Sequence, residues 1–522
     1  MEAGGASKLM CRHYAKRDIA ILQDHSCAFG WKLENGDQEF IMSSLQNKLK
    51  SRRGVRLFLA ISMTGASAIA FGKEPTPNPT PQSRAATDDQ AAAGTSPAPP
   101  PTALAETAAV PSTPPQSISE YDRFDELTEP GLTTNFPGSR DSVFRDTGGV
   151  RTWLADHDIG IQSRFSEGVI YNPLDTGQPR SPQRYNGQRL TLIGQVFNAV
   201  ATVGLAKVGL PNSRFIVGGT WAISSFEINS PNIVKIRNLA YYQSFFDKTV
   251  ELKVGIFPNS YEFVGLFTGG NPVLAAGFGG LIPIQAGLSA DPAFTPTANI
   301  TIHMDKDVYV KVGFQRSVSP RGAIYEANHN GIGLKFSADG AGLLTIGEVG
   351  IRRPATRSSK QIWLRMGGMY NGSDYSRFDG DGTSRNISAY AAADVQVTKR
   401  DTSAPAQGFY VGGSAFWADP KVTAFTQTYE GRIYDVGVLS SRPTDTAALR
   451  VGYTRFSSSA YRANLASGAY PNKYQVNVTG SYSAHVHHGI YLTPAIAYIR
   501  NPSFIGKFKD AALISGTLYL LL

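Results

Sequence analysis

The sequence lacks the features on which several large classes of protein depend. None of its 522 residues lies in an apolar run of eighteen or more, so no helix is built to cross a bilayer. Only two cysteines occur, Cys11 and Cys27, so the chain beyond them can form neither a disulfide framework nor a cysteine-based metal site. The G-x-S-x-G signature of many serine hydrolases is absent. The formal net charge of +9 is scattered rather than clustered, which argues against a nucleic-acid partner.

Two polar stretches also fall short of a metal site. His485 and His487 share one face of a strand, and two histidines alone make only a weak site. Asp379 and Asp381 lie in a glycine-rich stretch that lacks the spacing and the terminal glutamate of a calcium loop. We therefore expect no metal, no cofactor and no catalytic residue.

The main pattern of the sequence is an alternation of apolar and polar residues. From residue 159 to residue 522, apolar and polar residues alternate in segment after segment, with glycine-rich turns between them; residues 250–257 and 307–315 show the pattern most clearly. Because successive side chains of a strand point to opposite faces, each segment has one apolar and one polar face. The series predicts an all-β fold, a transmembrane antiparallel β-barrel that is apolar outside and wet inside.

Sixteen strands are expected, an even number as in other bacterial barrels, and a short helix at residues 149–156 precedes them. The predicted strands are residues 159–170, 190–203, 213–225, 233–246, 248–257, 307–317, 330–337, 343–352, 361–370, 387–398, 408–417, 431–440, 446–456, 474–486, 489–499 and 511–522.

One connection, from residue 259 to about residue 301, is too long for a simple turn. Loops of this length in a compact domain are usually functional or disordered. This one is rich in aromatic residues and glycine rather than in serine and lysine, which favours a folded insert. We expect it to fold into the lumen and to narrow the pore.

The chain also carries the pattern of an export signal. Basic residues within 48–56 lead into a short apolar core at 57–63, and small residues follow as far as Ala70. This is the layout of a secretory signal peptide, with cleavage expected after Ala68 or Ala70. A short buried helix is the alternative interpretation.

The N-terminal residues divide into three segments ahead of the barrel. We expect translation to begin at Met42, which makes residues 1–41 a non-native upstream segment and 42–70 a signal peptide for general secretion; an unusually long leading region is the alternative. Residues 71–130, rich in proline, alanine and threonine, are expected to form a disordered periplasmic linker or, failing that, a cell-wall-binding arm. The barrel is expected to occupy residues 131–522.

Five short segments, in this order along the chain, resemble the carbohydrate-selective porin family (OprB type) of outer membranes. They are residues 148–154 (GGVRTWL), 241–257 (YYQSFFD followed by LKVGIF), 412–420 (GGSAFWADP), 437–445 (GVLSSRPTD) and 492–502 (LTPAIAYIRNP). The resemblance covers the chain from about residue 144 to its end. Three positions depart from the expected pattern. Ala497 stands where the family tends to carry glutamine, and Thr479 where it tends to carry glutamate. The final residue is Leu522, where barrels typically carry an aromatic residue.

The resemblance implies a channel of the outer membrane through which small sugars diffuse passively into the periplasm. It implies sugars, outer-membrane lipid and the barrel-assembly machinery as partners, and a monomer or a homotrimer. An unspecific general porin is the nearest alternative. A barrel-based lipid hydrolase and a structural or adhesive surface protein are further alternatives.

Nine residues are candidate pore-lining or solute-binding groups, because a sugar channel needs charged hydrogen-bond partners and aromatic faces. Alternation places eight of them on the lumenal face, whereas Glu348 is ambiguous because Leu344 and Ile346 share its face. Each charge could instead simply face water or pair with a neighbouring strand. The nine are Arg164, Glu251, Lys253, Phe257, Tyr309, Lys311, Lys335, Glu348 and Arg365.

Overall fold

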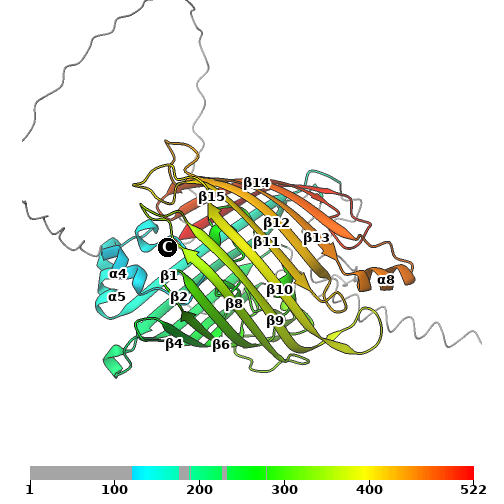
Figure 1. Ribbon diagram of the computed structural model, residues 1–522, viewed down its shortest axis with the longest axis horizontal. Helices are drawn as coiled ribbons and strands as arrows, with labels where there is room; N and C mark the ends of the chain where they lie inside the picture. The colour runs from blue at the N-terminus through cyan, green and yellow to red at the C-terminus, as the bar shows by residue number, and fades with distance from the viewer. Residues whose placement is uncertain (1–119, 176–186, 189, 226–231, 278) are drawn as a thin grey trace, which may run out of the picture. The chain divides into compact units, whose positions relative to one another are not determined.

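The computed structural model describes residues 120–175, 187–188, 190–225, 232–277 and 279–522. Sixteen strands form one closed antiparallel barrel in which every strand pairs with its neighbours in sequence and β16 pairs with β1 (Figure 1). The strands are β1 Ile159–Tyr171, β2 Leu190–Gly204, β3 Ser213–Ile223, β4 Ile233–Phe245, β5 Val250–Phe257, β6 Thr295–His303, β7 Val308–Arg316, β8 Leu343–Arg353, β9 Ile362–Ser376, β10 Thr383–Gln396, β11 Gly408–Ala418, β12 Phe425–Val436, β13 Thr446–Phe456, β14 Tyr474–His487, β15 Ile490–Arg500 and β16 Ala511–Leu521.

The helices among the described residues are short and do not form part of the barrel wall. They are α4 Glu120–Glu126, α5 Val150–Asp156, α6 Ile282–Gln285, α7 Ala323–His329 and α8 Ser458–Ala466. No helix among the described residues is long and apolar enough to cross a membrane. Helix α5 lies where a short helix was expected.

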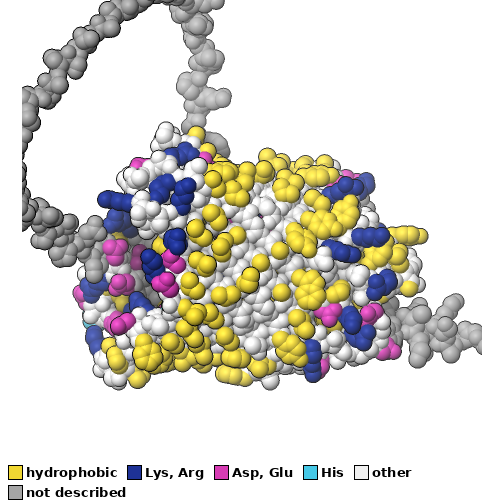
Figure 2. All heavy atoms as spheres, in the orientation of Figure 1, with side chains coloured by type: hydrophobic (Ala, Val, Ile, Leu, Met, Phe, Trp, Pro, Cys, Tyr) yellow, Lys and Arg dark blue, Asp and Glu magenta, His cyan; other side chains and the backbone are white. Residues whose placement is uncertain are grey.

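Alternation along each strand divides the wall into an apolar outer face and a packed inner face. In β9, Leu364 and Met366 are exposed on the outside, while Trp363 and Arg365 are buried inside. Figure 2 shows hydrophobic side chains gathered over the outside of the wall and charged side chains toward its two ends. An apolar outer surface of this kind is what contact with lipid requires.

The two ends of the barrel differ in the length of their connections. At one end, residues 246–249 join β4 to β5 and residues 488–489 join β14 to β15. At the other end, the connections include residues 258–294 and 317–342. We call these the short-turn end and the long-loop end. Arg151 of α5 donates a 2.9 Å hydrogen bond to the carbonyl of Leu522, which places α5 at the short-turn end.

The predicted number of sixteen strands is confirmed, but the prediction missed one strand and assigned another to residues that form turns. Residues 295–303 form β6, although they were assigned to the long connection; the strand starts with a Thr-Pro pair and its inward side chains are small, which hid its alternation. The strand predicted at 330–337 is wrong, because those residues form turns after α7. Two glycines, Gly331 and Gly333, gave this stretch a false alternation.

The predicted segments at residues 1–41 and 42–70, and the linker up to residue 119, lie outside the described residues. Helix α4 occupies part of the last stretch of the range assigned to the linker. After α4 the chain enters the barrel: the carbonyl of Leu127 accepts a hydrogen bond from Thr202 on the inner face of β2. The main chain of Thr133 and Thr134 then donates to the carbonyl of Tyr261.

Candidate functional site

The long connection between β5 and β6, residues 258–294, lies inside the barrel, and we call it the insert. Its apolar side chains pack against the inner face of the wall from β8 to β11 and form the largest buried cluster described. The cluster contains Phe263, Val264, Leu266, Ile282, Ala286 and Leu288 of the insert and Leu344, Ile346, Met369, Tyr390, Phe416 and Ala418 of the wall. The inner face of β8 is therefore apolar in part, which is why alternation could not place Glu348.

Glu348 holds the insert by its main chain. Its carboxylate accepts a 2.8 Å hydrogen bond from the amide of Val264. It also accepts hydrogen bonds from the hydroxyls of Tyr309 at 2.9 Å and Tyr390 at 2.8 Å. Hydrogen bonds to a charged acceptor are among the stronger ones in proteins, so this carboxylate fixes the first turn of the insert.

A ladder of alternating charges continues from that point around the wall. Arg365 donates to the carbonyls of Val264 at 2.6 Å and Gly265 at 2.8 Å, and it pairs with Asp394 at 3.2 Å. Asp394 pairs in turn with Arg432 at 2.8 Å.

The ladder ends on the far side of the insert. Glu430 joins Arg432 at 3.0 Å and Arg450 at 2.5 Å. Arg450 donates a 2.8 Å hydrogen bond to the carbonyl of Ala276. The side chains of all five charged residues are at most 8% exposed and all are paired, as charges removed from water must be.

The last part of the insert is held by amide side chains of the wall. Asn371 donates to the carbonyl of Ala286 at 2.7 Å, and Gln315 donates to that of Gly287 at 2.9 Å. Gly287 has φ +102°, and a Cβ there would lie 2.3 Å from the Asn371 amide. Only glycine fits this close approach.

The N-terminal segment is fixed beside the insert by a second buried network. Glu129 pairs with Lys253 at 2.9 Å and lies 3.8 Å from Arg237. Lys253 also pairs with Glu262 of the insert at 2.6 Å. Lys311 donates to the carbonyl of Glu262 at 3.1 Å. The lumen is thus narrowed by two segments that share their anchoring lysines.

The structure places seven of the nine candidate residues on the inner face, at no more than 7% exposure, beneath these two segments. They are Arg164, Lys253, Phe257, Tyr309, Lys311, Glu348 and Arg365. Arg164 stacks on Phe136 of the N-terminal segment, 3.7 Å from the ring centroid. Glu251 lies near the short-turn end and accepts hydrogen bonds from Tyr242 at 2.6 Å and His303 at 3.1 Å.

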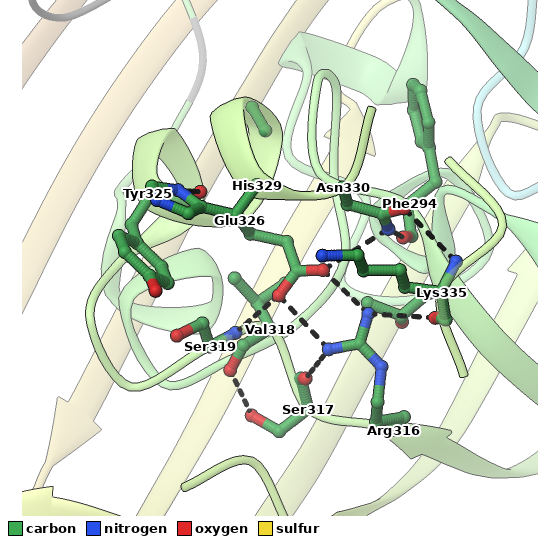
Figure 3. A network of polar contacts seen from close by, with 12 residues as sticks. Phe294, Arg316, Ser317, Val318, Ser319, Tyr325, Glu326, His329, Asn330 and Lys335 are labelled. Carbon is green, nitrogen blue, oxygen red and sulfur yellow. Dashed lines mark hydrogen bonds and ion pairs between the residues drawn. The ribbon is translucent and has the colours of Figure 1, made fainter. Parts of the chain in front are cut away.

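Lys335 is not on a strand; it is exposed in the connection between β7 and β8, residues 317–342, which we call the α7 loop. Figure 3 shows how that loop is fastened: Glu326 forms a two-pronged ion pair with Arg316, at 2.7 and 3.0 Å. Lys235 of β4 donates a 2.8 Å hydrogen bond to the carbonyl of Asn330. The α7 loop therefore bends over the inner wall at the long-loop end.

The opposite side of the lumen has a different character. The insert reaches this side at Ser481 and Ser483 and, through Val273, at Tyr491 and Leu521. In the middle of β14 and β16, at residues 475–481 and 515–519, the inward side chains are nevertheless half-exposed rather than buried. They carry hydroxyl or amide groups rather than charges: Asn477, Thr479, Ser481, Ser515 and Thr517. We call this surface the hydroxyl wall.

Sequence reasoning missed the hydroxyl wall, because serine and threonine carry no strong signal in a strand. The one available signal was the pair of departures from the family pattern. Thr479 of β14 and Ala497 of β15 are direct cross-strand partners, and both face the lumen on this side. The two departures, although they lie apart in the sequence, are therefore neighbours on the inner face of the barrel.

The histidines near residue 487 lie at the short-turn end and contact the N-terminal segment. The Nε2 atom of His485 lies 2.8 Å from a carboxylate oxygen of Asp141, and the amide of Gly489 donates to the same oxygen at 2.8 Å. Within the part of the chain that the structure describes, no three His, Cys, Asp or Glu residues are grouped to hold a metal ion.

Comparison with known proteins gives one family and several solved structures. The family model for the carbohydrate-selective porin, OprB family, matches residues 180–518. The high-pH structure of Pseudomonas putida OprB is similar with a TM-score of 0.62 and 16% sequence identity, over 73% of this chain and 98% of that one. At this identity the likeness supports the fold alone.

Two further structures are similar at lower scores. The low-pH structure of Pseudomonas putida OprB has a TM-score of 0.48 and 14% identity, over 73% of this chain and 98% of that one. The outer membrane channel DcaP of Acinetobacter baumannii has a TM-score of 0.44 and 10% identity, over 70% and 97%. No curated protein matches the chain.

Proposed function

This chain belongs to the OprB family of carbohydrate-selective porins, and on that premise we propose that it lets small sugars diffuse passively across the outer membrane into the periplasm, along its hydroxyl wall. The observation that carries the proposal is the division of the lumen. One side is filled by the insert and the N-terminal segment, and the other presents half-exposed hydroxyl and amide groups.

Such groups suit a neutral polyhydroxylated solute. A hydroxyl both donates and accepts a hydrogen bond, so each contact with the wall can replace one that the sugar makes with water. The exchange is close to neutral in free energy, since net contributions of single hydrogen bonds are about 0.5–1.5 kcal/mol. Passage needs binding strong enough to favour entry and weak enough to allow release.

The pair of Thr479 and Ala497 narrows the solute class. A glutamate at 479 and a glutamine at 497, as the family resemblance leads one to expect, would put a carboxylate and an amide into the passage. This chain presents a hydroxyl and a methyl group there instead. We propose that neutral sugars pass this point without a fixed negative charge beside them.

In this proposal, most of the nine candidate residues shape the pore instead of binding the solute. Seven of them hold or underlie the segments that narrow the pore, so they set its width rather than bind the solute. Long loops are typically external and short turns periplasmic, which puts α5 on the periplasmic side. We also propose secretion by the signal peptide at residues 42–70 and no enzymatic activity.

Planar-bilayer recording with added sugar tests this function. Replacing Thr479 and Thr517 by valine removes two hydroxyls from the wall without changing its shape. We expect the sugar concentration that halves the ion current to rise roughly two- to twelvefold for each hydroxyl removed. Thr345→Val is the matched control, because Thr345 lies on the outer face of β8.

Three outcomes would contradict the proposed function. If the double variant keeps the wild-type block, solutes do not pass along the hydroxyl wall. If liposomes swell equally fast with sugars and with amino acids of the same size, the protein is an unspecific porin. Esterase activity in the purified protein would favour the hydrolase alternative.

A further inference from the structure

The outer face of the barrel carries a hollow that the passage of solutes does not use. It has a volume of about 700 Å³ and spans β7 to β12. Its lining is almost wholly apolar and includes Val312, Gly347, Met366, Ala389 and Trp417. Figure 2 looks onto this wall and shows a pale central band of main chain and small side chains between hydrophobic side chains on either side.

The strand register makes this hollow a trough. Its floor is formed by Gly347, Gly368 and Ala389, which are successive cross-strand partners between Val312 and Trp417. A Cβ added at Gly347 would meet no atom within 4 Å, so the floor is open toward the membrane.

The length of the trough suits one lipid chain. Strands lie about 4.8 Å apart, so the four spacings from β7 to β11 span roughly 19 Å. One leaflet contributes about 15 Å to the hydrocarbon core of a bilayer, half of its roughly 30 Å thickness. An acyl chain of ordinary length can therefore lie between Val312 and Trp417.

Beyond Trp417, the same row of cross-strand partners continues with polar residues. Trp417 pairs with Gln427 of β12, and Gln427 pairs with Arg455 of β13. Arg455 is exposed on the outer face, one residue before β13 ends at the long-loop end. An apolar trough that ends in tryptophan, amide and guanidinium groups matches an acyl chain followed by an acidic headgroup.

We propose that this trough binds one acyl chain of an anionic lipid of the surrounding membrane, with the acidic headgroup of that lipid at Arg455. The trough is continuous with the apolar band that faces lipid, so its occupant need not leave the membrane. The guanidinium at its end selects a negative headgroup over a zwitterionic one. The lipid so held covers the part of the wall where the side chains are smallest.

Native mass spectrometry of the full-length protein in detergent tests the proposal. Dimyristoyl phosphatidylglycerol and dimyristoyl phosphatidylcholine are the probes, since they share their chains and differ in headgroup charge. The wild type should bind the anionic lipid more tightly, and Arg455→Gln should lower that affinity about two- to fivefold without affecting the zwitterionic lipid.

Gly347→Leu fills the trough and should weaken the binding of both lipids. Gly480→Leu is its matched control, because Gly480 on β14 also has open space at its Cβ but lies away from the trough. Equal lipid binding by the two leucine variants would overturn the proposal. So would a Gly347→Leu variant that dissociates an oligomer, because the trough would then hold a second copy of the chain. Arg455→Gln leaves the floor intact and keeps the test available if Gly347→Leu does not fold.

Discussion

Replacing Asp394 by asparagine should loosen the insert and raise the conductance of the pore. The carboxylate is fully buried and accepts hydrogen bonds from Arg432 at 2.8 Å, from Arg365 at 3.2 Å and from the amide of Gly269 at 3.3 Å. Arg365 also binds two carbonyls of the insert, so the change acts at the point of attachment.

The magnitude follows from the two arginines that lose their shared partner. Removing one partner of a buried charge costs about 3–5 kcal/mol when the remaining charge stays buried and unpaired. Here that charge is Arg365, since Arg432 keeps Glu430 at 3.0 Å. The main-chain pairing of the barrel does not involve Asp394, so we expect the docking of the insert to bear most of this cost. A loss of 3 kcal/mol changes the ratio of docked to undocked insert by roughly 150-fold.

Single-channel recording measures the effect as a larger or more variable conductance. Asp401→Asn, in an exposed turn, is the control and should behave as the wild type. A second variant that adds Arg432→Gln removes the other arginine bound to Asp394, and a double-mutant cycle should show that the effects of the two changes are not additive. Wild-type conductance in Asp394→Asn, with the protein correctly folded, would refute the view that this ladder holds the insert.

Three further predictions concern Asp445, the Thr479 and Ala497 pair, and Glu326. Burial alone would raise the pKa of Asp445, but hydrogen bonds from Arg442, Tyr482 and the amide of His485 outweigh burial and lower that pKa. The ionised carboxylate of Asp445 therefore stabilises the fold above a pH of about 4. This stability is lost as the pH falls through the lowered pKa. Thermal unfolding should show Asp445→Asn below the wild type at pH 7 and level with it in strong acid, whereas a constant difference would contradict this. Thr479→Glu combined with Ala497→Gln adds a carboxylate to the passage and should raise cation over anion permeability, which an unshifted reversal potential would disprove. Glu326→Gln breaks the ion pair that fastens the α7 loop, so limited proteolysis should cut residues 317–342 faster than in the wild type, and equal rates would argue that the loop is held by other contacts.

The barrel was predictable because lipid imposes a simple rule on every strand. In β7, Val310, Val312 and Phe314 face outward and the residues between them face inward, as alternation requires. Alternation did not reveal β6, because its inner face carries threonine and asparagine instead of charges. Residues 330–337 alternate without belonging to the sheet, and Ile332 merely accepts a hydrogen bond from the amide of Ile236.

The contents of the lumen could not be predicted in the same way. Alternation assigns Arg365 to the inner face, where the structure has it. Alternation cannot show what Arg365 meets there, because its partner Val264 is 101 residues away in the sequence. The same limit hid the hydroxyl wall, because its half-exposure depends on the insert packing chiefly against β8 to β11.

Many polar side chains of the wall hold the insert through its peptide groups. Arg365, Arg450, Asn371 and Gln315 all donate to its carbonyls, and Glu348 accepts from one of its amides. Peptide groups are common to all residue types, so insert side chains outside the buried apolar cluster can change without breaking these hydrogen bonds. A lineage could thus adapt to a new carbon source by substitutions in this one segment, while the surrounding scaffold is inherited unaltered.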